Sequence, residues 1–201
     1  KGIKKKRGDF DTSQMAKRYS ENKIYEGVIE NYNRICPGTK AILFASNVES
    51  SKEMAMKFNL AGIEARHLDS DMLDSERREI LRWFNNTKTG ILCNIGILTT
   101  GFDCPDIQTV ILYRATTSLP LFLQMVGRGS RTIQGIKDKF TILDFGNNIK
   151  MHNFWEAPRK WSLKKKPKRE KVDVAPVKIC PQCNAMLAIS VSQCSFSGLA
   201  Y

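Results

Sequence analysis

The sequence predicts an α/β fold, a parallel β-sheet flanked by helices, followed by a small C-terminal extension that contains cysteines. Two observations lead to this prediction. Apolar runs of five or six residues alternate with amphipathic segments, which is typical of buried parallel strands joined by helices. Polar pairs also follow three of these runs, at Ser46-Asn47, Thr99-Thr100 and Thr116-Thr117. Because open α/β sheets bind ligands beyond the carboxyl ends of their strands, a ligand is expected at that edge.

The expected elements can be placed in order along the chain. Two helices come first, over residues 12–19 and 23–35, and Pro37-Gly38 ends the second. The expected strands are residues 40–45, 63–68, 90–94, 109–113 and 139–144. Helices are expected between them over residues 49–61, 75–85 and 118–126. Gly62 suits the position just past a helix end, while Asp74 and Thr117 suit N-caps because their side-chain oxygens can accept from the first turn.

Composition predicts three parts: a body over residues 1–150, a basic linker over 151–171 and a cysteine-containing tail over 172–201. The net charge is +12, and residues 1–7 and 159–171 together carry all of the excess. A neutral body with two basic segments favours a polyanion partner, most simply nucleic acid. The alternative is that the lysines only keep a solvated linker soluble.

The compartment is predicted from what the sequence contains. No apolar run approaches the ~18 residues of a membrane span, and no N-terminal signal pattern is present, so no membrane partner is expected. Cys36, Cys93 and Cys104 lie in apolar segments and are expected to be buried free thiols. The cysteine spacing is not a disulfide framework, which favours a cytoplasmic protein. Because the chain begins at Lys1, it is expected to be part of a longer protein.

Two segments carry candidate chemistry. In ILTTGFDCPDI at 97–107, hydroxyls can donate to phosphate, Gly101 permits close backbone approach, and Asp103 can accept from a ribose hydroxyl or orient a neighbouring arginine. In QMVGRGSR at 124–131, Arg128 and Arg131 end a predicted helix, where two guanidinium groups suit a phosphate chain. Taken singly, the first could be an ordinary turn and the second a glycine-ended helix.

Together, and with a strand between them, these segments resemble motifs V and VI of superfamily 2 helicases. Gln124, Gly127, Arg128 and Arg131 match motif VI, with Ser130 in place of the usual second glycine. AILFASNVESS at 41–51 resembles motif IV. The resemblance extends over residues 10–148 and is closest to the DEAH-type helicases of the RadD-like and restriction-subunit-like group.

The resemblance covers only the second, RecA-like C-terminal helicase domain. A complete helicase also has a first RecA-like domain, whose P-loop and Asp-Glu motif bind ATP and Mg²⁺, and neither motif occurs in this sequence. The resemblance therefore implies an ATP-dependent helicase or translocase as the full-length protein. It also implies that this chain is inactive alone and that its partners are nucleic acid and the N-terminal RecA-like domain of the same protein.

The family pattern also implies residue roles. Arg128 and Arg131 would act as arginine fingers on the γ-phosphate, and Gln124 would contact phosphate or the attacking water. The residues implied to face the nucleotide are Gly101, Asp103 and Gly127. The residues implied to bind backbone phosphates of nucleic acid are Ser46, Asn47, Thr99 and Thr100. The nucleic acid is expected to be DNA, because relatives in this subgroup mostly act on DNA.

The tail carries a third pattern. Cys180 and Cys183 form a C-x₂-C pair, and Cys194 follows at a spacing typical of a zinc ribbon. The expected fourth ligand position holds Ser197, whose hydroxyl is a poor zinc ligand. We therefore expect sub-stoichiometric zinc or none, and a vestigial tail is the alternative. His67 and His152 receive no role.

Three functions compete at this point. The motor domain described above is favoured, and a non-motor nucleic-acid-binding module with a RecA-like fold is the alternative. A small-molecule enzyme such as a phosphotransferase is disfavoured, because the sequence offers no nucleophile, no acid/base pair and no P-loop.

Overall fold

The computed structural model describes residues 5–6, 9–10, 14, 24–96, 103–159, 161 and 177–201. Contacts divide the chain into two compact units, Lys1–Asn148 and Ile149–Tyr201, which are described separately below. The helix predicted over 12–19, apart from residue 14, and most of both basic segments lie outside the described residues. So do Thr99, Thr100 and Gly101. The three-part division of the chain stays a prediction.

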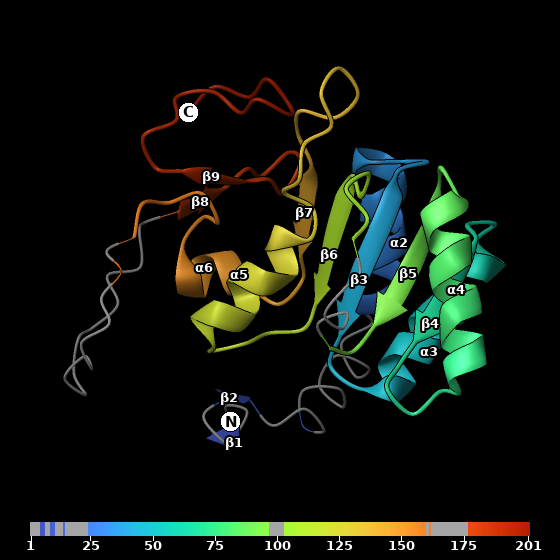
Figure 1. Ribbon diagram of the computed structural model, residues 1–201. Helices are drawn as coiled ribbons and strands as arrows, with labels where there is room; N and C mark the ends of the chain where they lie inside the picture. Colours follow the sequence, from blue (N-terminus) through green and yellow to red (C-terminus); the bar gives the residue numbers. More distant parts are fainter. Residues whose placement is uncertain are drawn as a thin grey trace. The chain divides into compact units, whose positions relative to one another are not determined.

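The first unit contains a five-stranded parallel sheet (Figure 1). Its strands are β3 (Lys40–Ala45), β4 (Ala65–Leu68), β5 (Gly90–Asn94), β6 (Thr109–Tyr113) and β7 (Thr141–Asp144). Their order in the sheet is β4-β5-β3-β6-β7, and each neighbouring pair is parallel. Central strand β3 pairs Leu43 with Cys93 of β5 and with Ile111 of β6. This arrangement confirms the predicted α/β class and RecA-like sheet. A separate two-residue pair, β1 (Lys5–Lys6) with β2 (Asp9–Phe10), is antiparallel.

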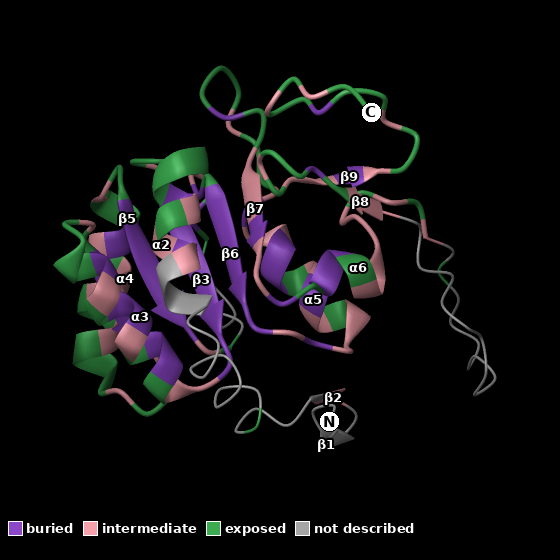
Figure 2. Ribbon diagram, turned by 180° about the vertical axis from the view of Figure 1, so that it is seen from behind, coloured by how far each residue is buried: buried purple, intermediate pink, exposed green. Residues whose placement is uncertain are grey.

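Helices cover both faces of the sheet. Helices α2 (Ile24–Ile35) and α3 (Val48–Leu60) pack on one face, and α4 (Asp74–Asn86) and α5 (Leu119–Gly127) lie on the other (Figure 1). Strands β3, β5 and β6 are buried along their whole length (Figure 2), because each alternate side chain meets a helix. This explains the continuous apolar runs in the sequence. The three cysteines predicted to be buried, Cys36, Cys93 and Cys104, are buried free thiols.

Two predicted N-caps are wrong, for physical reasons visible in the structure. Asp74 is the first residue of α4, and its carboxylate lies 3.5 Å from the Arg77 guanidinium instead of capping the helix. Helix α5 is capped by Ser118, whose hydroxyl accepts from the Leu121 amide, whereas Thr117 binds Asp9. Gly62 has the predicted left-handed conformation, with φ 77°.

Strand boundaries also differ slightly from prediction. Strand β4 begins at Ala65, two residues later than expected, because the Ile63 amide closes the turn after α3 by donating to the Phe58 carbonyl. Strand β7 begins at Thr141. Within the described part of the chain, no helix is both long and apolar enough to cross a membrane.

The second unit begins within helix α6 (Asn148–His152), at Ile149. A small antiparallel hairpin pairs β8 (Val177–Ile179) with β9 (Met186–Ala188). The buried residues around it are Cys180, Leu187 and Cys194. Arg159, the first residue of the second basic segment, donates to four backbone carbonyls of residues 152–157, so this charge has a local structural use.

Candidate functional site

Residues 124–131, which we call the arginine segment, end at the edge of the sheet formed by the amino ends of the strands. We call this edge the amino edge. Helix α5 begins after the carboxyl end of β6 and runs back along the sheet, with Arg128 as its C-cap residue. Gly129 then touches the start of two strands: a Cβ on it would lie 2.6 Å from both Val110 of β6 and Phe140, which precedes β7. Only glycine allows this approach. The arginine segment therefore ends at the edge opposite the carboxyl ends of the strands, where the sequence predicts a ligand.

An ion pair joins the two candidate motifs at the amino edge. The Arg131 guanidinium contacts the Asp103 carboxylate, and the two side chains are 43% and 68% exposed. Arg128 is half-buried and Gln124 is exposed one turn earlier on α5. Asp103 and Arg131 can therefore both reach a ligand placed against this edge.

Two buried lysines that the sequence analysis did not single out also lie at the amino edge. The Lys137 ammonium donates to the carbonyls of Pro105 and Gly129, at 2.9 and 2.7 Å. The Lys40 ammonium lies 2.8 Å from Asp106 and contacts the Phe84 ring. A lysine at the start of an apolar strand was the available signal for Lys40. For Lys137, sequence offered none.

Burial and pairing shift several pKa values at this edge. Burial lowers the pKa of Lys137, while the nearby Asp106 carboxylate opposes that shift. Burial raises the pKa of Cys104 to about 12, so its thiol stays protonated and donates to Asp106. Burial alone would raise the pKa of Asp106, but hydrogen bonds from Cys104 and Lys40 bring it below its ordinary value.

The carboxyl ends of the strands form the opposite edge of the sheet, which we call the carboxyl edge. Ser46 and Asn47, the described residues that were predicted to bind nucleic acid, lie there. Ser46 is buried, with its hydroxyl 3.5 Å from that of Ser50. Asn47 caps α3: its Oδ1 accepts from the Ser50 amide, and the Ser50 hydroxyl bonds back to the Asn47 backbone. Because the cap uses only the Oδ1 atom, the Nδ2 group of Asn47 can still donate to a phosphate.

The carboxyl edge after β6 is occupied by a carboxylate from the N-terminal segment. Asp9 accepts from the Thr116 hydroxyl, the Thr117 amide and the Thr117 hydroxyl, at 2.5, 2.6 and 3.1 Å. The Arg114 guanidinium lies 4.0 Å from the same carboxylate. These threonines therefore hold a protein carboxylate.

A buried hydrogen-bond chain, also missed from sequence, follows β4. His67 Nδ1 lies 2.7 Å from the Ser51 hydroxyl and Nε2 lies 2.7 Å from Asp69. Burial lowers the pKa of His67, and the hydrogen bond from His67 lowers that of Asp69, so the resting pair is neutral imidazole with carboxylate. Nε2 then carries the proton and Nδ1 accepts from Ser51. Ser51 is fully buried, so this chain joins α3 to the β4–α4 loop and is not a nucleophile.

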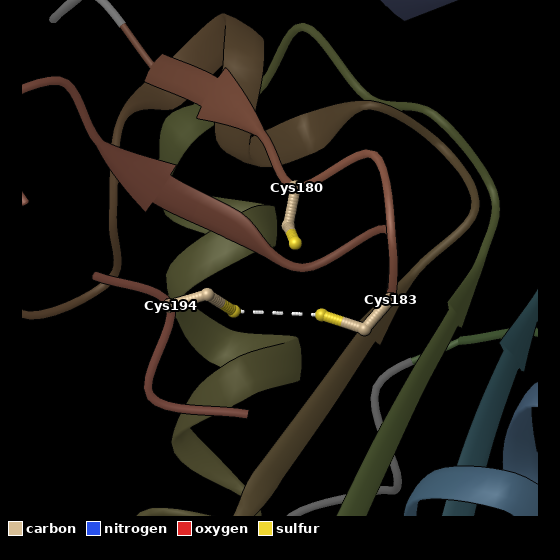
Figure 3. Close-up of side chains that lie close together, drawn as sticks. All are labelled: Cys180, Cys183 and Cys194. Atoms are coloured by element: carbon tan, nitrogen blue, oxygen red, sulfur yellow. Dashed lines mark hydrogen bonds between the residues drawn. The ribbon is translucent and has the colours of Figure 1, made fainter. Parts of the chain in front are cut away.

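In the second unit the three tail cysteines converge (Figure 3). Their sulfur atoms all lie within 4.8 Å of one another, and Cys183 and Cys194 are 3.5 Å apart. Zinc bound tetrahedrally at about 2.3 Å from each sulfur requires sulfurs about 3.8 Å apart. The donor set and spacing therefore fit zinc.

Two matching turns build this cluster. Asn184 N donates to Cys180 O and Gly198 N donates to Cys194 O, both at 2.8 Å, and residues 184 and 198 both have positive φ. The second turn therefore places Ser197 where the first turn places Cys183. The Ser197 hydroxyl lies 3.3 Å from the Cys180 sulfur. Burial would raise the pKa of Cys180, but hydrogen bonds from Ser197 and Tyr201 bring it down to about 6.

Comparison with known proteins identifies relatives of this chain. A 51.5 kDa protein of Lactococcus phage (isolate 7-9) is 32% identical over 199 residues, covering 96% of this chain and 43% of the relative. The Saccharomyces cerevisiae protein named "Putative ATP-dependent helicase IRC3" is 30% identical over 146 residues, covering 71% of this chain and 21% of the relative. The chain thus spans less than half of the length of either protein.

Solved structures share the fold. A fragment described as "a putative HsdR subunit of a type I restriction enzyme" from Vibrio vulnificus YJ016 superposes with a TM-score of 0.60 at 24% identity, covering 73% of this chain and 32% of that one. The C-terminal domain of S. cerevisiae Dbp5 bound to Gle1 and IP6 gives 0.51 at 18% identity, covering 65% and 75%. The family model described as "Helicase conserved C-terminal domain" matches residues 24–132. Since this match covers more than half of the chain, the chain belongs to the family of helicase conserved C-terminal domains.

Proposed function

We propose that this chain is the second motor domain of an ATP-dependent DNA helicase or translocase. In this proposal it supplies Arg128 and Arg131 to the γ-phosphate of an ATP held, with Mg²⁺, mainly by a first RecA-like domain. The observation that carries the proposal is the Arg131–Asp103 ion pair, which joins an exposed side chain from each of two family-typical segments at one edge of the sheet.

Each group at the amino edge has a chemical task in this proposal. The two guanidinium groups stabilise the charge that spreads over the phosphate oxygens in the transition state, which is worth about 10³–10⁵ in rate. Asp103 orients Arg131, and Gln124, exposed one turn before Arg128, contacts the phosphate or its attacking water. Gly101 and Gly127 allow the backbone to approach the nucleotide.

The carboxyl edge serves nucleic acid in the same proposal. The Nδ2 group of Asn47, together with Thr99 and Thr100, meets backbone phosphates of one strand, whereas Ser46 is buried beside Ser50 and does not reach that strand. Phosphate contacts position a strand without reading bases, so no sequence preference is expected. The basic segments add nonspecific attraction that weakens as salt rises. DNA is proposed because the motifs most resemble the restriction-subunit-like group.

The test uses the complete protein that carries this chain with its first domain. Arg128→Ala and Arg131→Ala should each lower nucleic-acid-stimulated ATP turnover by at least ~10³, while nucleic-acid affinity changes little. Arg82→Ala, which removes an exposed arginine of α4, is the matched control and should retain turnover. Normal turnover in both test variants would favour the alternative, a non-motor nucleic-acid-binding module.

We also propose that Cys180, Cys183 and Cys194 hold a structural Zn²⁺, with the Ser197 hydroxyl at the fourth corner. Three thiolates and a weak oxygen ligand predict partial occupancy. Ser197→Cys should give one zinc per chain by elemental analysis, because the two matching turns then present four thiolates. Ser192→Cys, which adds an exposed thiol in the same unit, should give no gain. A full equivalent in the unmodified chain would show that another ligand completes the site.

A further inference from the structure

Lys137 lies in the turn that follows the arginine segment. Ile133 and Lys137 form an isolated antiparallel bridge, with N–O distances of 2.9 and 2.8 Å, which folds this turn back toward β7. The Lys137 side chain is directed inward and the residue is only 6% exposed. Such burial is rare for a lysine unless its ammonium group is well paired.

The partners of the ammonium group are backbone carbonyls from both halves of the amino edge. One belongs to Pro105, two residues after Asp103, and the other to Gly129, two residues before Arg131. The ammonium also lies 5.9 Å from the centre of the Phe140 ring. A single buried cation therefore fixes the backbone on each side of the exposed Arg131–Asp103 pair.

From this geometry we infer that Lys137 is a positioning residue for the arginine fingers. It holds the Gly129 backbone against the Pro105 loop, so that Arg131 and Asp103 start from a fixed base. Because its ammonium faces two carbonyls inside the protein, Lys137 does not itself touch the nucleotide. This inference rests on the proposed function, in which Arg131 acts on phosphate.

Lys137→Met, which keeps the volume of the side chain and removes its donors, tests the inference in the complete protein. We expect kcat for ATP to fall on the order of 10²-fold, the effect of a catalytic group displaced by about 1 Å. KM for ATP and affinity for DNA should change little. If Lys137→Met does not fold, Lys137→Gln, which keeps an uncharged NH₂ donor group on a shorter side chain, should show an intermediate loss of kcat.

A double-mutant cycle separates positioning from general support. In an Arg131→Ala background, Lys137→Met should lower kcat only slightly further, because the group that Lys137 positions is already gone. An equal loss of kcat in both backgrounds would overturn the inference.

Tyr32→Phe is the control for the loss of a buried hydrogen bond elsewhere in the fold. Tyr32 is 1% exposed, and its hydroxyl donates to the Thr39 carbonyl. This variant should lose stability while kcat per folded molecule is retained. If Arg131→Ala leaves turnover normal, the proposed function fails. If Arg131→Ala abolishes turnover but Lys137→Met behaves like Tyr32→Phe, only this inference fails.

Discussion

The two edges of the parallel sheet are built from different chemistry. The amino edge exposes a charged pair, Arg131 and Asp103, above two buried lysines. At the carboxyl edge, the side chains of Asn47 and His67 and the carboxylate of Asp9 are hydrogen-bonded within the protein. One edge therefore presents an exposed charged pair that can act on a phosphate, and the other presents polar groups that mostly bind one another.

Under the proposed function, this difference would let one small domain contact both ATP and nucleic acid. Long charged side chains lose rotamer freedom when they bind, so a rigid base beneath them preserves their effect. In the same proposal, uncharged donors contact backbone phosphates without reading base identity. Changes at the amino edge should therefore affect turnover, and changes at the carboxyl edge should affect stability and strand binding.

A large effect on folding is expected from Gly129→Ala at the amino edge. The added Cβ would lie 2.6 Å from Val110 and Phe140, so strands β6 and β7 or the arginine segment must shift. We expect the free energy of unfolding to fall by about 1–3 kcal/mol, as for other overpacked sites, measured by urea titration. Turnover should fall further than the loss of folded protein explains.

Gly127→Ala is the control for that substitution. Nothing lies within 4 Å of a Cβ on Gly127, the last residue of α5, and alanine is the better helix former. This variant should unfold at the same or a higher urea concentration. If it is as unstable as Gly129→Ala, close packing at Gly129 is not the reason for the effect.

A smaller, pH-dependent effect is expected at the carboxyl edge. Because burial lowers the pKa of His67, the unfolded chain takes up a proton before the folded chain does as pH falls. The contribution of His67 is therefore complete above its ordinary pKa of about 6.5 and is lost below it. His67→Gln should flatten the decline in unfolding free energy between about pH 6.5 and 5. His152→Gln, which leaves His67 in place, should keep that decline.

Much of the fold could be predicted because both faces of the sheet are covered, so β3, β5 and β6 read as continuous apolar runs. Spacing also predicted the converging cysteines, since each turn closes within four residues. The N-caps of α4 and α5 could not be predicted, because Asp74 and Thr117 found other partners in Arg77 and Asp9.

The supporting residues of the candidate site were the hardest to predict. The contacts of Lys137 with Pro105 and of Lys40 with Asp106 join residues that are far apart in the chain, and a lysine in sequence looks like a solvated charge. His67 was likewise passed over, although a histidine and an aspartate two residues apart after a strand were a usable signal. The edge of the sheet at which Arg128 and Arg131 lie depends on the direction in which α5 runs, and the sequence does not reveal that direction.

The central claim is that Arg131 acts on phosphate and Asp103 orients it. Exchanging the two charges, with Arg131→Asp and Asp103→Arg in one complete protein, tests it most directly. The exposed ion pair can re-form with its charges exchanged. The free energy of unfolding, measured by urea titration, should therefore change by no more than the small amount that a surface ion pair contributes. ATP turnover should nevertheless stay at least ~10³ below the unmodified protein, because the guanidinium is no longer at position 131. Recovery of turnover in the exchanged protein would show that the pair is only structural and would contradict the account.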